Sequence, residues 1–322
     1  TSCTQQPKAP EAFTPIKVET PARPAGQEDV IQLVTPKIDT VRVGFIGLGM
    51  RGPIRNSGFE LQLDGRIIDR AVKWDLGVNF SLNRSKVLVL SEDKDIFGGE
   101  LDNTILKDQL NLMRVGEPMY VFYGYVEDGY DENGHIVYKN MDDDPAITAA
   151  DKTIIGDPNP DFLVNLTTAV SYKGFTLSAF FQSSIGNDIY SLSMAAQAYD
   201  YGYNGNTLRE VYYNHWSPEN PTAKYPNLDQ TSYKMSDRFV YDGSFVRLKN
   251  LELAYDVPCA RSKFIKRARV YVSAQNLFTI TSYPFWDPDI NANGGGSSMI
   301  QGVDSYCYPS ARTYTIGCRL TF

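Results

Sequence analysis

Apolar and polar residues alternate with a period of two over most of the chain from Phe59 onward. In the stretch FELQL, Phe59, Leu61 and Leu63 occupy one face, and Glu60 and Gln62 occupy the other. This period is typical of β-strands that have one apolar and one polar face. It predicts strands of about ten residues that contain residues 59–69, 73–82, 162–172, 175–181, 250–255, 269–275 and 314–322.

The connections between these predicted strands are alternately short and long. The short ones are Asp69-Arg70, Lys173-Gly174 and the basic stretch 258–267, and the long ones are 84–117, 184–243 and 282–311. A soluble β-sandwich shows the same alternation, but its strands are usually shorter and its loops more even. Short turns on one side and long loops on the other are typical of outer-membrane barrels. Two further strand candidates, 118–127 and 134–140, keep this order whether both cross the membrane or neither does.

The chain ends in TYTIGCRLTF, with an apolar or aromatic residue at every second position. These positions are Tyr314, Ile316, Cys318, Leu320 and Phe322. Such a strand resembles the signal by which outer-membrane barrels are recognised for assembly, although any edge strand can also end in Phe. Together with strand length and loop pattern, it predicts an all-β fold. We expect an antiparallel meander that forms the C-terminal part of a transmembrane β-barrel.

Composition and charge exclude several other classes of protein. The 322 residues carry a net charge of −7, and the pI of about 5.0 argues against nucleic acid as a partner. The sequence has no apolar run near the ~18–20 residues that a membrane-spanning helix needs. A helical membrane protein is therefore excluded, whereas barrel strands hide their apolar residues by alternation. The four cysteines have no metal-ligand or CxxC spacing.

The first forty residues differ from the rest, because they are rich in Pro, Ala, Gln and Lys. Such a segment buries too little surface to fold alone, so we expect residues 1–40 to be a flexible tether. Cys3 matches either the acylated cysteine of a bacterial lipoprotein or an ordinary linker cysteine.

A short apolar strand formed by Val41, Val43, Phe45 and Ile46 follows. After it comes Gly47-x-Gly49-x-x-Gly52, the spacing of a dinucleotide-binding turn. The glycines would allow backbone N–H groups to approach a pyrophosphate. However, Pro53 leads directly into the alternating segment, without the helix and second strand that such a site needs. We therefore expect residues 41–53 to be a truncated fragment of a Rossmann-like fold that binds no NAD, and we predict no cofactor.

Two segments of the sequence resemble known protein families. Residues 8–53 resemble the leader and first turn of glycoside hydrolase family 109, whose members are secreted NAD-dependent glycosidases. Residues 54–322 resemble the SusC/RagA family of TonB-linked outer-membrane receptors of Bacteroidota. The phrases that carry the second resemblance include GFELQLDGRIID, YKGFTLSAFFQSSIGNDIY, VYDGSFVRLKNLELAYDVP and YPSARTYTIGCRLTF.

The second resemblance implies a barrel of the TonB-dependent receptor type in the outer membrane, which imports glycan fragments or peptides. It implies a SusD-like surface lipoprotein, the TonB complex and the barrel assembly machinery as partners. The family's TonB box, plug and earlier strands precede the matching part. Residues 54–322 are therefore expected to form a partial barrel of seven to nine strands, against about 22 in the largest plugged transporters, and to be inactive alone.

The alternative function is an NAD-dependent glycosidase, which only the N-terminal leader supports. Family 109 catalytic residues would fall beyond Pro53 and cannot be assigned to this sequence. His135 and His215 have no recognisable nucleophile partner or metal spacing. We therefore predict no enzyme activity and no catalytic residue. The two resemblances meet near residues 52–54. The join between them is either a genuine gene fusion or an artefact of assembling the DNA sequence.

The long loops supply candidate residues for substrate contact, because aromatic faces stack on sugar rings. These candidates are Tyr199, Tyr201, Tyr203, Tyr212, Tyr213, Trp216 and Trp286. Loop packing or an aromatic girdle at the membrane interface is the simpler explanation for any one of them. Asp142, Asp143, Asp144 and Asp151 suggest a Ca²⁺ loop, but they lack the regular spacing and the Gly. We expect a solvated acidic loop there and predict no metal site.

Overall fold

The computed structural model describes residues 38–46, 54–102, 106–199, 206–259, 264–290 and 299–322. All of them lie in one compact unit of residues 36–322. The predicted tether and the glycines Gly47, Gly49 and Gly52 lie outside the described residues.

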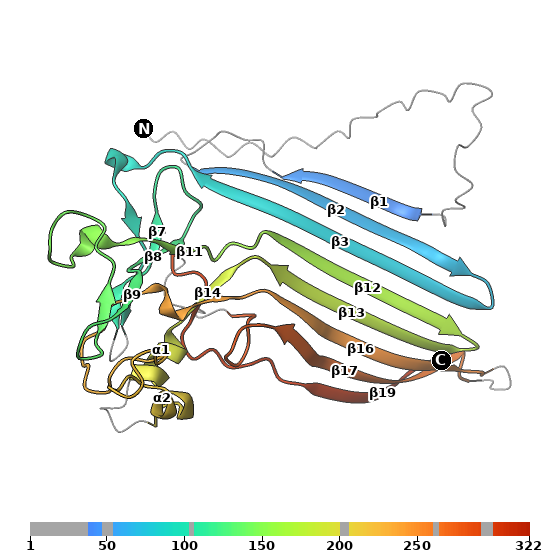
Figure 1. Cartoon of the computed structure of the whole chain (residues 1–322). Helices are drawn as coiled ribbons and strands as arrows, with labels where there is room; N and C mark the ends of the chain where they lie inside the picture. The colour runs from blue at the N-terminus through green and yellow to red at the C-terminus, as the bar shows by residue number, and fades with distance from the viewer. Residues whose placement is uncertain (1–37, 47–53, 103–105, 200–205, 260–263, 291–298) are drawn as a thin grey trace, which may run out of the picture. The chain divides into compact units, whose positions relative to one another are not determined.

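One antiparallel sheet of eight strands runs through the molecule (Figure 1). Its spatial order is β1-β2-β3-β12-β13-β16-β17-β19, so each strand pairs with the strands before and after it along the meander. The strands are β1 (Ile38–Ile46), β2 (Ile54–Asp69), β3 (Val72–Val87), β12 (Phe162–Tyr172), β13 (Phe175–Ile185), β16 (Phe245–Val257), β17 (Arg267–Thr281) and β19 (Thr313–Thr321).

The connections confirm the predicted order of short and long. Residues 70–71, 173–174 and 258–266 join strands at one end, and residues 88–161, 186–244 and 282–312 join them at the other. The first long connection continues well past residue 117. The strand candidates 118–127 and 134–140 lie within it as short strands of small sheets, so neither belongs to the large sheet.

The strand predicted at Val41 to Ile46 is present, and it extends the edge of the large sheet. β1 pairs antiparallel with β2, and the register pairs Val41 with Leu63, Val43 with Leu61 and Phe45 with Phe59. Val41, Val43 and Phe45 are therefore in register with apolar residues of β2, whereas Ile38 and Ile46 are paired with Gly65 and Gly58. A Rossmann-like unit would instead pair this strand in a parallel sheet.

The three long connections lie together at one end of the large sheet and form a part of the molecule that we call the cap (Figure 1). Its strands are β4 (Ile96–Phe97), β5 (Glu100–Asp102), β6 (Lys107–Gln109), β7 (Asn111–Met113), β8 (Val121–Gly124), β9 (Glu127–Tyr130), β10 (Ile136–Tyr138), β11 (Thr153–Gly156), β14 (Asp188–Ser191), β15 (Val240–Asp242) and β18 (Val303–Asp304). Its helices are α1 (Leu192–Tyr199), α2 (Arg209–Tyr213) and the 3₁₀ turns Ser91–Asp93, Ala149–Asp151 and Asp237–Phe239.

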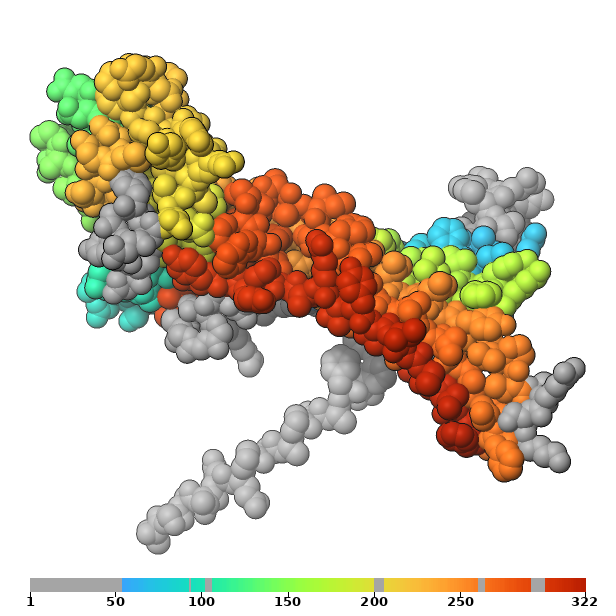
Figure 2. Space-filling view, turned by 90° about the horizontal axis from the view of Figure 1, so that it is seen from below, coloured from blue at the N-terminus to red at the C-terminus, as the bar shows by residue number. Residues whose placement is uncertain are grey.

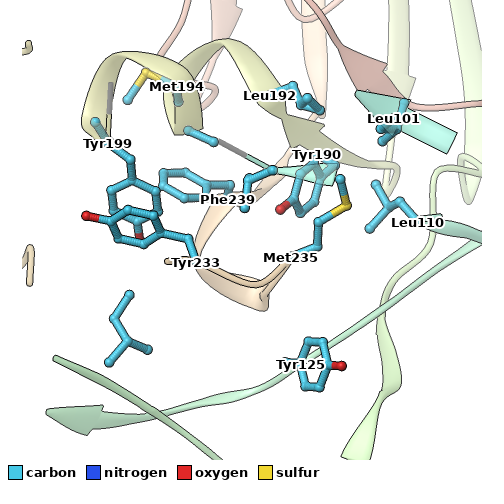
Figure 3. Close-up of a cluster of buried hydrophobic side chains, with 14 of the residues drawn as sticks. Leu101, Leu110, Tyr125, Tyr190, Leu192, Met194, Tyr199, Tyr233, Met235 and Phe239 are labelled. Carbon is cyan, nitrogen blue, oxygen red and sulfur yellow. The ribbon is translucent and has the colours of Figure 1, made fainter. Parts of the chain in front are cut away.

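The hydrophobic core lies in the cap (Figure 3). Tyr190, Phe239 and Met235 are almost completely buried there, and Leu110 packs into the same cluster. These side chains come from the first two connections, and Val303 of the third belongs to the same cluster, so the core holds the three connections together. Burial of side chains of this size contributes roughly 1.5–3 kcal/mol each to folding.

Candidate functional site: a polar cleft beneath the cap

The two faces of the large sheet differ in chemistry. Leu177, Leu253, Val272 and Ile316 are consecutive partners across β13, β16, β17 and β19. Their exposed fractions are 48, 45, 47 and 83 %, so in the described part of the chain nothing covers this row. A soluble sandwich would bury such a row beneath a second sheet. We call this the apolar face.

The last strand lies on the edge of this sheet. Figure 2, seen from below, shows the dark red C-terminal strand along that edge. Tyr314, Ile316, Leu320 and Phe322 are all exposed, and Cys318 is exposed as well. In register, Tyr314, Ile316, Cys318 and Leu320 pair with Ala274, Val272, Val270 and Ala268, so the alternation predicted for this strand continues the apolar face.

The aromatic candidates are distributed between the interior and the surface of the cap. Tyr199 is only 4 % exposed, and its ring stacks on that of Tyr233 with centroids 3.8 Å apart (Figure 3). Tyr212 and Tyr213 on α2 are exposed. Trp216 is half-buried, and its ring lies against Gly134.

Trp286 is exposed and stacks on Phe285, with ring centroids 4.7 Å apart. Tyr201 and Tyr203 lie outside the described residues. Tyr199 therefore presents almost no surface to a ligand, whereas Tyr212, Tyr213 and Trp286 present theirs to solvent.

The aspartates of the acidic loop also differ in their exposure to solvent. Asp142, Asp143 and Asp144 are exposed, as expected for a solvated loop. Asp151 is instead completely buried: its carboxylate accepts backbone N–H bonds from Met141 and Thr148, both at 2.7 Å. These N–H donors lower the pKa of Asp151. The described residues contain no cluster of three or more potential metal ligands.

A cleft of about 460 Å³ lies where the polar face of the sheet meets the cap, and its lining is mixed, with apolar residues such as Leu163 and Phe245 beside the polar ones. The sheet contributes Asn165 on β12 and Gln182 on β13, which are direct cross-strand partners. All three connections of the cap also line it, with Tyr120, Asn187 and Asp289 among their residues. This cleft could not be identified from the sequence, because its residues come from six separate segments.

A buried amide holds two walls of the cleft together. Asn111 is 1 % exposed, and its Nδ2 donates to the carbonyl oxygens of Tyr120 at 2.8 Å and Gln301 at 3.0 Å. Both acceptors belong to residues that line the cleft. Tyr120 has a φ of 64°, in the left-handed region that is uncommon for residues other than Gly. Such strained residues often occur at functional sites.

A buried ion pair positions the third wall. Arg247 on β16 is 1 % exposed. Its guanidinium pairs with Asp287, donates to Thr279 Oγ1 at 2.9 Å and Ser310 Oγ at 3.1 Å, and lies 3.3 Å from Asp289 Oδ2. Burial alone would raise the pKa of Asp287, but backbone N–H donors from Ser310 and Asp289 and the Arg247 guanidinium outweigh it. The pKa of Asp287 is therefore lowered.

No helix among the described residues is long and apolar enough to span a membrane. No family model matches the chain. Individual relatives do match, and they fall into two groups that cover different parts of the sequence.

The first group covers 84 % of the chain. TonB-dependent receptor P3 of Formosa agariphila is 32 % identical over 293 residues, and TonB-dependent receptor SusC of Bacteroides thetaiotaomicron is 28 % identical over 282 residues. Among solved structures, the RagAB peptide importer in its closed-closed state superposes with a TM-score of 0.69 at 25 % identity, also over 84 % of the chain. The chain spans 29, 27 and 30 % of these three proteins, respectively.

The second group covers only the N-terminal segment. Glycosyl hydrolase family 109 protein 1 of Bacteroides thetaiotaomicron is 77 % identical over 53 residues, which are 16 % of this chain and 11 % of that enzyme.

The antiparallel meander is similar to that of the RagAB structures, and the curated relatives that match 84 % of the chain are named TonB-dependent receptors. Within that class, residues 54–322 are similar to the SusC/RagA family, and the N-terminal segment is similar to glycoside hydrolase family 109. Both resemblances drawn from the sequence are thereby confirmed, as is the fold class.

Proposed function

We propose that residues 54–322 form the C-terminal wall and loop cap of a SusC-like, TonB-dependent receptor in the outer membrane, which imports glycan fragments or peptides. The uncovered row of Leu177, Leu253, Val272 and Ile316 is the observation that carries this proposal. Lipid tails would cover such a row, while the paired strands satisfy the backbone polar groups that lipid cannot.

We propose a SusD-like lipoprotein above the cap and the TonB complex as the partners of this receptor. The barrel assembly machinery would recognise the final strand through Tyr314, Ile316, Cys318, Leu320 and Phe322. Tyr212, Tyr213 and Trp286 are the aromatic candidates whose exposed rings are available to a substrate at the cap surface. We propose no enzyme activity, because the glycosidase similarity covers only a short segment.

Cell fractionation of a strain that expresses the full chain tests this proposal. We expect the chain in the outer-membrane fraction, released only by detergent, and we expect no TonB-dependent uptake by the chain alone. An open sheet leaves two strand edges unpaired, so it cannot enclose a channel. Recovery as a soluble protein that retains NAD would favour the glycosidase instead. Uptake driven by TonB with this chain as the sole receptor would contradict the predicted inactivity.

A further inference from the structure

The cleft beneath the cap has side-chain amides with unused hydrogen-bonding capacity. Asn165 and Gln182 are half-buried, they face each other across the β12–β13 ladder, and both line the cleft. Their side chains make no hydrogen bond to the part of the chain that the structure describes. Each amide can both donate and accept, so together the two side chains offer four N–H donors and two carbonyl oxygens as acceptors, all of them uncharged.

The charges around the cleft are already balanced. Asp289 is the only carboxylate among the described residues that line it, and no Lys, Arg or His lines it. Arg247 and Lys249 lie 3.3 and 3.8 Å from the Asp289 carboxylate. A charged ligand would find no free opposite charge here, and desolvating an unpaired charge is costly. The cleft is therefore suited to an uncharged ligand.

The floor of the cleft offers no free strand edge. β12 is paired with both β3 and β13, and β13 is paired with both β12 and β16. Proteins often recognise an extended peptide by adding it as a further strand to a sheet edge. That mode is not open at the floor of this cleft. Recognition must instead come from the side chains that project into the cleft. Its volume of about 460 Å³ lies in the usual range for small-molecule sites.

We propose that this cleft binds an uncharged, hydroxyl-rich ligand, of the kind that a neutral oligosaccharide presents, through the side-chain amides of Asn165 and Gln182. The inference rests on the proposed receptor function and narrows its substrate class. Sugar hydroxyls both donate and accept, which matches two neighbouring amides. Asn111 acts as a positioning residue, because it holds the Tyr120 and Gln301 carbonyls rather than facing the ligand.

The test uses the full chain, extracted from outer membranes in detergent. Binding is measured by calorimetry against neutral oligosaccharides of glucose, mannose, xylose and galactose, and against short peptides with free, charged termini. We expect at least one neutral oligosaccharide to bind and the peptides not to bind. Asn165→Leu and Gln182→Met should each weaken that binding about tenfold, as expected for the loss of hydrogen bonds from a site that excludes water.

The neighbouring strand β3 offers a matched control. Asn79 pairs with Asn165 in register on the same face, but it does not line the cleft, so Asn79→Leu should leave binding unchanged. The inference is overturned if only the peptides bind, if no oligosaccharide binds, or if Asn79→Leu weakens binding as much as Asn165→Leu. Those outcomes leave the receptor proposal standing when the chain is still recovered in the outer membrane. Recovery in the soluble fraction would count against the receptor proposal itself.

Discussion

At the scale of single residues, Arg247 shows how the sheet positions a wall of the cleft. Its guanidinium and the Asp287 carboxylate are both buried, and each has additional hydrogen-bond partners. A buried ion pair adds little net stability over a well-packed apolar pair, but removal of one partner leaves an uncompensated charge. Removal of Arg247 is therefore expected to disturb the placement of residues 282–290, which carry Asp287 and Asp289.

We expect Arg247→Met to destabilise the chain by about 3–5 kcal/mol, because Asp287 would remain buried without a counter-charge. The double variant Arg247→Met with Asp287→Asn should recover part of this loss, since the charge is then absent. The recovery is partial because both Asp287 oxygens accept backbone N–H bonds, from Asp289 and from Ser310. Urea unfolding in detergent measures the difference. A double variant no more stable than Arg247→Met would contradict this account.

At the scale of elements, the tight turn between β12 and β13 sets the register of the strands that form the cleft floor. Lys173 and Gly174 have φ values of 48° and 87°, as the two central residues of a type I′ turn require. The turn brings Tyr172 opposite Phe175, and the same register places Asn165 opposite Gln182. A distortion at the turn would therefore be transmitted to the cleft.

Gly174→Ala should cost about 1–2 kcal/mol, because a residue with a Cβ is disfavoured at this φ. The added Cβ would also lie 3.2 Å from Tyr255 Cε2 and 3.3 Å from the Asp256 carbonyl oxygen. Lys173→Asn is the matched control, since Asn tolerates the left-handed region better than Lys, and it should be neutral or stabilising. Unfolding in urea compares the three proteins. Equal stability of Gly174→Ala and the unmodified chain would show that the turn tolerates a Cβ.

At the scale of the whole molecule, β1 is an unexpected component of the sheet. The segment similar to glycoside hydrolase family 109 ends near residue 53, yet its strand pairs with a receptor-like strand. The matching positions arise because both segments alternate with a period of two. Among the described strands, β1 and β19 form the two edges of the sheet, so the leader covers an edge that β2 would otherwise expose.

A pair of cysteines tests this register in the full chain. In a background whose four native cysteines are replaced by Ser, Arg42→Cys and Gln62→Cys should be joined by a short bifunctional crosslinker, because these positions are direct partners. Arg42→Cys with Arg66→Cys is the control, since residue 66 lies four positions, or about 13 Å, further along the strand. Equal crosslinking of both pairs in membranes, or none of either pair, would show that β1 does not hold this register.

Much of this architecture could be predicted from the sequence, because a sheet with one apolar and one polar face requires apolar and polar residues to alternate along each strand. The strands, their order of short and long connections, and the continuation of the apolar face through Tyr314 to Leu320 follow from that pattern. The cap could not be predicted in the same way. Its short strands and helices lack a sustained period, and contacts such as that between Asn111 and Gln301 join residues far apart in the sequence.

By itself, the sequence determined the fold class, the family resemblances and the faces of the strand segments in which the alternation is unbroken. Only the tertiary structure decided what each residue on the polar face does. Asn79 and Asn165 occupy equivalent polar positions in the alternation, yet one is exposed and the other lines the cleft. Arg247 shares the period-two phase of Leu251 and Leu253, but the register shift between Leu248 and Asn250 pairs it with Gln182, and there it is buried in an ion pair. Alternation specifies a side of the sheet, whereas packing of the cap determines which part of that side is covered.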